Sequence, residues 1–338
     1  FTSRAYLGGK IDLSQAEAVA DLIASSSRAD HALATNQMRG GYSEELEGLR
    51  DKLLQLTSLL ELELDFSEED VEFADRTALR ETMERIGGEI DRLRNSFALG
   101  NAIKEGVAVA IVGAPNVGKS TLLNRLLNED RAMVSEIAGT TRDVIEEQAN
   151  IGGVRFRFLD TAGIRATGDR LERMGIERTM ESIRRAQVVI RLLDARDLEG
   201  GIPAATFTLR QGQRLLTVIN KLDAAPEGFR PMEGTIGISA RRGDGIEALC
   251  RALRDAVDTE GVYHGETVVS NSRHYEALTA ARQSLASALD GLDRGLPADL
   301  LSEEIRPVIS RLGEITGRGA IAPDEVLENI FSKFCIGK

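Results

Sequence analysis

The sequence predicts an α plus α/β protein, in which a helical bundle domain carries an inserted domain with a mostly parallel sheet and helices on both of its faces. Three observations support this fold class. Apolar residues recur at helical spacing toward both ends of the 338-residue chain. Between these regions, short apolar runs alternate with helical stretches. A glycine-rich loop follows the first apolar run, which is typical of phosphate sites in α/β proteins.

Residues 11–103 are predicted as the first part of the helical domain. One helix is expected to begin at Ser43, a plausible N-cap that precedes Glu44 and Glu45. Two helices then each carry one apolar stripe in steps of three and four residues, which indicates an antiparallel bundle. The stripes are Leu46, Leu49, Leu53, Leu56, Leu60 and Leu64, and Leu79, Met83, Ile86, Ile90, Leu93 and Phe97.

Residues 104–260 are predicted as the inserted domain. Gly152 and Gly153 separate two apolar runs and indicate a hairpin, so one edge of the sheet is expected to be antiparallel. The other runs have the continuous apolar character of buried parallel strands. The expected strands are residues 107–112, 146–151, 154–159, 188–193, 215–219 and 235–238.

Residues 261–338 are predicted as the second part of the helical domain. Two further apolar stripes have helical spacing, and Pro323 and Asp324 are expected to open a final helix. Helical regions on both sides of the α/β region are the reason for expecting an insertion. The stripes are Leu278, Leu285, Leu289 and Leu292, and Leu301, Ile305, Val308, Leu312 and Ile315.

Composition narrows the functional classes. No run approaches the roughly 20 apolar residues that a membrane span needs, so a soluble protein without membrane contact is expected. The formal net charge of −12 argues against tight nucleic-acid binding by this chain alone. The chain has two cysteines, Cys250 and Cys335, which do not make a disulfide scaffold and favour a reducing cytoplasm.

The glycine-rich loop matches the phosphate-binding P-loop pattern G-x-x-x-x-G-K-[ST] from Gly113 to Ser120. An apolar strand precedes it and a leucine-rich helical stretch follows it, which is the context that the motif requires. Backbone N–H groups and the helix N-terminus can therefore hold an anion. Lys119 is expected to reach the β- and γ-phosphates, and the Ser120 hydroxyl to bind Mg²⁺.

Four later stretches follow the P-loop in the order found in Ras-like GTPases. Asp160-Thr161-Ala162-Gly163 can face the Mg²⁺ shell and the γ-phosphate, and Gly139–Asp143 includes threonines suited to a switch loop. Asn220-Lys221-Leu222-Asp223 places a carboxylate where it can accept from guanine N1–H and N2–H₂. Adenine lacks this donor pair, so GTP is expected rather than ATP. Ser239-Ala240 can present an N–H to guanine O6.

Ile164 follows the Asp160–Gly163 stretch, at the position where Ras-type GTPases carry a water-orienting glutamine. An apolar side chain cannot polarise water. Another group must do so, or hydrolysis is slow without help.

Two terminal segments add a specific resemblance. The chain ends in Phe334-Cys335-Ile336-Gly337-Lys338 and opens with Arg4–Lys10, followed by Asp12-Leu13 and Gln15–Ala18. Together with Asn116 in the P-loop and Gly139–Asp143, these segments resemble the MnmE (TrmE) family of tRNA-modification GTPases over the whole chain. The family's N-terminal folate-binding domain would precede Phe1, and residues 1–10 correspond to its end.

The resemblance implies a homodimer whose GTPase activity depends on K⁺ and on dimerisation of the GTPase domains. It implies a heterotetramer with an FAD-binding partner protein that adds an aminomethyl or carboxymethylaminomethyl group to C5 of the wobble uridine of certain tRNAs. The one-carbon unit would come from 5-formyltetrahydrofolate or another tetrahydrofolate.

The resemblance also implies roles for individual residues. The K⁺ ligands would be Asn116, Ser135, Ile137 and Thr140, and the Mg²⁺ ligands Ser120 and Thr141. Glu172 would orient the attacking water, and Lys10 and Lys338 would contact folate. The full set of expected GTP-binding residues is Asn116, Val117, Gly118, Lys119, Ser120, Thr121, Ser135, Glu136, Ile137, Ala138, Gly139, Thr140, Thr141, Asp160, Thr161, Ala162, Gly163, Asn220, Lys221, Asp223, Ser239 and Ala240.

Two questions stay open at this point. Cys335, between Phe334 and Ile336, is either a buried apolar residue or a catalytic or substrate-positioning thiol. The chain is either a GTPase in tRNA modification or a regulatory GTP switch for ribosome or membrane-protein assembly, with the helices as a partner-binding scaffold. The two terminal segments favour the tRNA-modification function.

Overall fold

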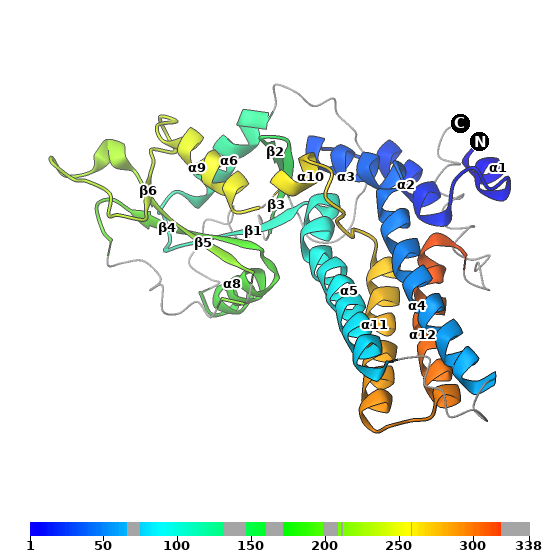
Figure 1. Ribbon diagram of the computed structural model, residues 1–338. Helices are drawn as coiled ribbons and strands as arrows, with labels where there is room; N and C mark the ends of the chain where they lie inside the picture. The colour runs from blue at the N-terminus through cyan, green and yellow to red at the C-terminus, as the bar shows by residue number, and fades with distance from the viewer. Residues whose placement is uncertain are drawn as a thin grey trace. The chain divides into compact units, whose positions relative to one another are not determined.

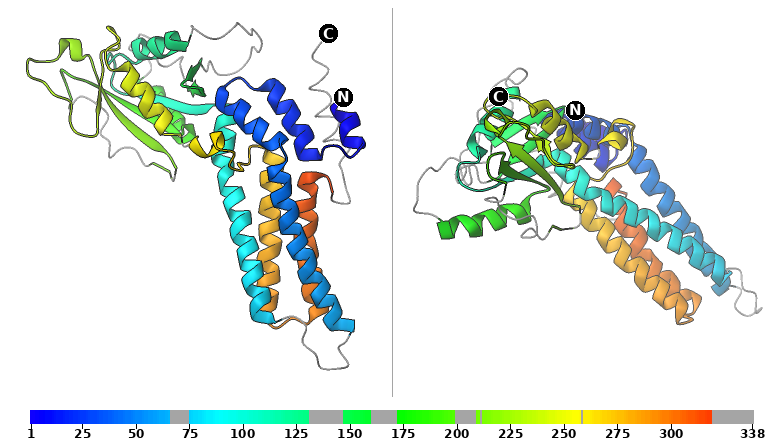
Figure 2. Two further views of the ribbon diagram at one scale, coloured as in Figure 1. Left: turned by 45° about the horizontal axis from the view of Figure 1, so that its top comes forward. Right: turned by 90° about the vertical axis from the view of Figure 1, so that its left-hand side faces the viewer.

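A computed structural model of the chain describes residues 1–65, 75–130, 147–159, 172–198, 209–210, 212–257 and 259–318 (Figures 1 and 2). The chain divides into two compact units. Unit 1 combines residues 1–104 with residues 259–338, and unit 2 is residues 105–258. The α/β region is therefore inserted between two helical segments that fold together. The finer division, with residues 1–10 as the end of a further domain, stays a prediction.

Four long helices form the bundle of unit 1 and lie side by side in Figures 1 and 2. They are α4 (Gly41–Asp65), α5 (Arg76–Glu105), α11 (Ser272–Asp293) and α12 (Ala298–Thr316). The predicted stripes supply one continuous core, in which residues such as Leu53, Met83, Leu285 and Ile305 are fully buried. Burial of one stripe per helix stabilises a bundle whose helices have no other apolar partner.

The described part of unit 1 also contains four shorter helices, α1 (Thr2–Leu7), α2 (Leu13–Ala24), α3 (Arg28–Met38) and α10 (Glu260–Tyr263). The helix predicted from Pro323 lies outside the described residues. Helix α2 begins with a reciprocal capping box. Asp12 accepts from the Gln15 N–H at 2.9 Å, and the Gln15 side chain accepts from the Asp12 N–H at 3.0 Å. Two N–H groups that would otherwise lack partners are thereby satisfied at the start of α2.

The predicted N-cap at Ser43 is wrong. Helix α4 begins at Gly41, after Gly40 in a left-handed conformation with φ of 92°. Ser43 lies inside the helix, is buried, and its hydroxyl forms a 2.9 Å hydrogen bond with that of Ser14. Because Gly40 readily adopts the left-handed conformation, the turn after α3 ends there and α4 begins at Gly41, two residues before Ser43.

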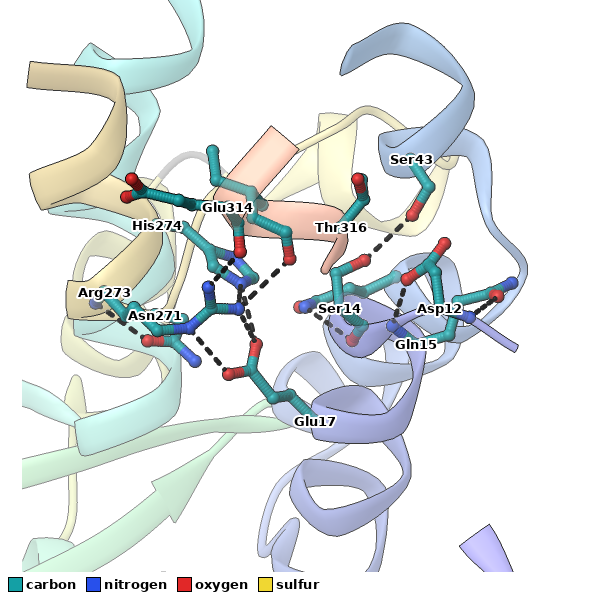
Figure 3. A network of polar contacts seen from close by, with 12 residues as sticks. Asp12, Ser14, Gln15, Glu17, Ser43, Asn271, Arg273, His274, Glu314 and Thr316 are labelled. Carbon is teal, nitrogen blue, oxygen red and sulfur yellow. Dashed lines mark hydrogen bonds and ion pairs between the residues drawn. The ribbon is translucent and has the colours of Figure 1, made fainter. Parts of the chain in front are cut away.

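A buried polar network joins α2, α11 and the end of α12 (Figure 3). Arg273 donates to both Glu17 carboxylate oxygens at 2.9 Å, and to the carbonyls of Glu314 at 2.7 Å and Ile315 at 3.1 Å. His274, with no exposed surface, lies 2.7 Å from Glu17 through its Nε2. One guanidinium therefore satisfies the last carbonyls of α12 and neutralises a buried carboxylate of α2. We call Glu17, Arg273 and His274 the clasp.

Burial sets the protonation states in the clasp. Burial lowers the pKa of His274 and outweighs the carboxylate of Glu17, so the ring is neutral at pH 7. Burial alone would raise the pKa of Glu17, but contacts with His274 and Arg273 lower it to about 2. With His274 neutral, Arg273 carries the positive charge that keeps Glu17 ionised.

Unit 2 contains a six-stranded sheet with the strand order β2-β3-β1-β4-β5-β6. Strand β2 pairs with β3 antiparallel at one edge, and all other pairs are parallel. This confirms the predicted mostly parallel sheet with one antiparallel edge. The strands are β1 (Val107–Val112), β2 (Glu147–Ile151), β3 (Val154–Phe158), β4 (Val188–Asp194), β5 (Arg214–Asn220) and β6 (Ile236–Gly237).

Helix α8 (Glu172–Arg185) covers one face of the sheet, and α6 (Lys119–Asp130) and α9 (Ile246–Asp255) cover the other (Figure 1). A short 3₁₀ helix, Leu222–Ala224, follows β5. All six residues of β1 are buried, as expected for a central parallel strand. The carboxyl ends of β1, β4 and β5 meet at one edge of the sheet, where ligands bind in open α/β folds.

Candidate nucleotide site

The P-loop connects β1 to α6 at this edge of the sheet. Gly118 has φ of 101°, and a Cβ atom there would lie 2.3 Å from the Asn220 Nδ2 atom. Only glycine fits both the backbone conformation and this close approach. Asn116 also has a left-handed backbone, with φ of 64°. The tight turn brings the loop back over the N-terminus of α6, which begins at Lys119.

Lys119 is half-buried and its ammonium group points back onto the loop. Nζ donates to the carbonyls of Gly113 and Ala114, both at 2.8 Å. Burial lowers the pKa of this ammonium, so an anionic partner would stabilise its charged form. The two carbonyl oxygens stand where phosphate oxygens would serve the same donor.

Asn220, the last residue of β5, links the P-loop to the loop after β6. Its side chain is buried, donates to the Val117 carbonyl at 2.8 Å and accepts from the Ala240 N–H at 2.9 Å. The first residue of the predicted base-recognition motif thus fixes the phosphate loop and the Ser239-Ala240 segment relative to each other.

Lys221 has φ of 65° and extends along the P-loop. Its Nζ donates to the Asn116 carbonyl and, at 2.8 Å, to Asp194 Oδ2. A pocket of about 370 Å³ lies beside these groups. Its lining residues are Ala114, Pro115, Asn116, Val117, Asp194, Arg196, Asp197 and Lys221.

Asp223 is prepared to act as an acceptor. The Ser239 hydroxyl donates to its Oδ1 at 2.6 Å, and this bond lowers the pKa of the Asp223 carboxyl. The same Ser239 oxygen accepts from the Arg242 N–H at 3.2 Å. The carboxylate is therefore ionised and oriented, as a ligand that presents two donors requires.

The structure brings thirteen of the predicted ligand or catalytic residues into its described part, twelve of them in or beside the nucleotide site or on helix α8. Lys10 is exposed in the turn after α1, in unit 1. Glu172 is the first residue of α8, in unit 2. The described residues are Lys10, Asn116, Val117, Gly118, Lys119, Ser120, Thr121, Glu172, Asn220, Lys221, Asp223, Ser239 and Ala240, with Glu172 described in its backbone alone.

The remaining predicted site residues lie outside the described part of the chain, and their roles stay predictions. They belong to the loop before β2, the stretch after β3, and the C-terminal segment. They are Ser135, Glu136, Ile137, Ala138, Gly139, Thr140, Thr141, Asp160, Thr161, Ala162, Gly163, Cys335 and Lys338.

Three residues at the site were not predicted from the sequence. Asp194 ends β4 at the ligand-binding edge, and Arg196 donates to its two oxygens at 2.9 and 2.6 Å. Arg125 of α6 donates to the carbonyls of Ala240 at 3.3 Å and Arg241 at 2.9 Å. A carboxylate at the end of a buried parallel strand was a usable signal for Asp194, whereas nothing in the local sequence marked the two arginines.

The described residues suit a Mg²⁺–nucleotide complex. Ser120 places a half-buried hydroxyl in the first turn of α6, directly after the loop whose lysine faces the anion position. A hydroxyl oxygen is a ligand that Mg²⁺ accepts beside phosphate oxygens. Asn116 contributes an exposed amide beside the pocket, which is a neutral oxygen donor suited to a monovalent cation.

Comparisons with known proteins identify relatives over the whole chain. A family model described as the MnmE helical domain matches residues 13–335. Proteins called tRNA modification GTPase MnmE from Cytophaga hutchinsonii and Bacteroides thetaiotaomicron are each 50% identical to this chain. A protein of the same name from Flavobacterium johnsoniae is 49% identical. All three match 100% of this chain, which covers 74%, 76% and 75% of them, respectively. Among the described residues, no helix is both long and apolar enough to cross a bilayer.

Proposed function

This chain belongs to the MnmE family of tRNA modification GTPases, and from that membership we propose how its residues bind and hydrolyse GTP. The observation that carries the proposal is the joint geometry of three motifs at one sheet edge. Asn220 bonds to both the P-loop and the Ser239-Ala240 segment, and Ser239 orients Asp223. One rigid cradle therefore holds the phosphate and the base of the same nucleotide.

In this proposal, the P-loop N–H groups and Lys119 bind the phosphates. Lys119 exchanges its two carbonyl partners, 2.8 Å away, for the β- and γ-phosphate oxygens. The exchange replaces neutral acceptors with anionic ones, which favours the charged lysine whose pKa burial has lowered. Ser120 and Thr141 would hold Mg²⁺, which neutralises charge on the phosphates.

Asp223 selects guanine in this proposal. Its ionised carboxylate, held by Ser239 at 2.6 Å, accepts from N1–H and N2–H₂ of the base. Adenine has an acceptor, N1, and a C2–H at these positions, so it would leave the carboxylate without a matching N–H donor. The predicted contact of Ser239-Ala240 with guanine O6 would need a rearrangement, because the Ala240 N–H donates to Asn220 Oδ1 at 2.9 Å and the Ser239 N–H donates to the Asp244 carbonyl at 2.9 Å.

Glu172 orients the attacking water in this proposal, because Ile164 cannot. Glu172→Ala should lower GTP turnover by roughly 10²–10⁴, as expected for a lost general base, while GTP binding is retained. Asp169→Ala and Glu177→Ala are matched controls from the same stretch. Equal losses in all three variants would show a folding defect and refute the catalytic assignment.

We further propose that a monovalent cation and dimerisation complete the site. Asn116, Ser135, Ile137 and Thr140 would hold K⁺, which supplies the positive charge that an arginine supplies in other GTPases. A second GTPase unit would order the loop that contains Ser135 and Thr140. Each of the two requirements would then strengthen the other.

GTP hydrolysis would drive modification of C5 of the wobble uridine in certain tRNAs. The reaction would take place in the cytoplasm, within a heterotetramer that includes an FAD-binding protein. Lys10 and Lys338 would contact the tetrahydrofolate that supplies the one-carbon unit. The net charge of −12 favours a division of labour in which the partner contributes to tRNA binding.

Mass analysis of wobble nucleosides tests the function. Cells that lack the protein should lose the C5-modified uridines, and wild-type protein should restore them. Lys119→Ala should fail to restore them, whereas Asp255→Asn, at the exposed end of α9, should succeed. An unchanged nucleoside profile in the deletion strain would refute the modification function and favour a regulatory GTP switch.

A further inference from the structure

Two residues of the nucleotide site have a backbone conformation that L-residues rarely adopt. Among the described residues, Asn116 and Lys221 are the non-glycine residues with positive φ, at 64° and 65°. Such a conformation costs on the order of 1–3 kcal/mol for a residue such as lysine, and less for asparagine, which tolerates the left-handed region. Asn116 carries the amide of the proposed cation site, so the contacts that hold it bear on that site.

A hydrogen bond joins these two residues directly. The Lys221 ammonium donates to the Asn116 backbone carbonyl and, at 2.8 Å, to Asp194 Oδ2. Asn116 is exposed and Lys221 is half-buried, so packing alone does not fix either of them. The lysine bond holds the Asn116 carbonyl directly, beside the bond from Asn220 to the next carbonyl, that of Val117.

Asp194 fixes the lysine. This residue is 8% exposed and accepts four hydrogen bonds. Arg196 donates three of them, from its backbone N–H at 3.0 Å, Nε at 2.9 Å and Nη2 at 2.6 Å. The hydrogen bonds from Arg196 and Lys221 hold the pKa of Asp194 well below its usual range, so the carboxylate stays charged. A charge-assisted bond to a buried, fully ionised carboxylate orients the ammonium better than water would.

We propose that Asp194 is a positioning residue for the monovalent-cation site at Asn116, acting through Lys221. This inference rests on the proposed K⁺ dependence. Asp194 anchors Lys221, Lys221 holds the Asn116 peptide in its strained conformation, and the fixed peptide presents the amide oxygen to the cation. A preorganised ligand lowers the ordering cost of binding, so loss of the anchor should weaken cation affinity before it affects the chemical step.

The test compares the full-length chain as wild type, Asp194→Asn and Asp255→Asn. The control makes the same isosteric change, with the same change in net charge, at an exposed position of unit 2. GTP hydrolysis is measured at saturating GTP while K⁺ replaces choline at constant ionic strength. Independently of turnover, thallium NMR follows binding of Tl⁺, a K⁺ substitute, to protein loaded with GDP and fluoroaluminate.

For Asp194→Asn we expect the half-saturating K⁺ concentration to rise roughly tenfold, as for loss of one charge-assisted hydrogen bond. Tl⁺ binding should weaken by the same factor, kcat at saturating K⁺ should stay within about twofold, and the control should match wild type. An unchanged half-saturation point would overturn the inference, as would a loss of kcat that no K⁺ concentration restores. A wild-type protein that neither binds Tl⁺ nor prefers K⁺ to Na⁺ would instead overturn the cation site itself.

Discussion

The clasp at the end of α12 should contribute a large share of the local stability of unit 1, and Arg273→Met tests this. The substitution keeps much of the side-chain length but removes the four hydrogen bonds of the guanidinium to Glu17, Glu314 and Ile315, together with its 3.0 Å contact with His274 Nε2. Glu17 is 6% exposed, so its carboxylate would remain buried beside a neutral histidine. The carbonyls of Glu314 and Ile315 would lose their donor as well.

The magnitude follows from the type of contact. Removing one partner of a buried ion pair typically costs about 3–5 kcal/mol, because the other charge stays buried and uncompensated. The double variant Glu17→Gln/Arg273→Met leaves a neutral amide that can still accept from His274. It should therefore be more stable than Arg273→Met alone, by about 2 kcal/mol, although it carries one more substitution.

Hydrogen exchange followed by mass spectrometry measures this effect in each unit separately. A loss of about 3 kcal/mol in the free energy of local opening corresponds to roughly 10²-fold faster exchange. We expect this acceleration in peptides from α2 and the end of α12. Peptides from β4 and β5 in unit 2 are the internal control and should exchange as in wild type.

Two results would refute the reasoning. Exchange in α2 and α12 within about threefold of wild type would mean that the clasp contributes little. A double variant less stable than Arg273→Met would mean that the uncompensated charge of Glu17 is not the main cost. Equal acceleration in both units would instead point to a global effect on the chain.

Two further predictions concern pH and base recognition. His274 and Glu17 both have lowered pKa values in the folded state, so each stabilises unit 1 above its unfolded pKa and loses this effect as the pH falls. Acid should therefore lower the free energy of unfolding of unit 1 below about pH 6.5 because of His274, and lower it further between about pH 4.5 and pH 2 because of Glu17. Urea unfolding at a series of pH values measures both phases, and His274→Gln should remove the first one. Asp223→Asn should replace an acceptor by a donor facing guanine N1–H, so nucleotide competition should show a shift toward XTP, and an unchanged preference for GTP would contradict the base-reading role.

The fold class was predictable because its signals are local and periodic. Strand β1 coincides with the predicted run of residues 107–112, since a strand buried on both faces must be apolar throughout. The P-loop was predictable because its turn requires a positive φ at Gly118, a local backbone conformation that glycine adopts readily. The N-cap predicted at Ser43 is wrong because a serine before two glutamates is equally compatible with the inside of a helix.

The contacts that assemble the site were not predictable in the same way. Asp194 and Lys221 are 27 residues apart, and Glu17 and Arg273 are 256 apart. Hydrophobic periodicity specifies which face of an element is buried, but it does not specify which charged side chains meet across elements. Only the strand order, with β4 between β1 and β5, brings Asp194 against the lysine that follows β5.

The contacts of the P-loop also connect the predicted base-recognition motif to the predicted phosphate-binding loop. The Lys221 side chain donates to the Asn116 carbonyl, and the Asn220 side chain donates to the Val117 carbonyl. In a trans peptide the C=O and the following N–H point in opposite directions, so the next two N–H groups face away from these side chains and toward the anion position. In the proposed GTP site, the first two residues of the predicted base-recognition motif would therefore turn the phosphate-binding amides inward. A substitution at Asn220 should weaken binding of nucleotides that differ only in their base by the same factor, whereas Asp223 alone should discriminate between them.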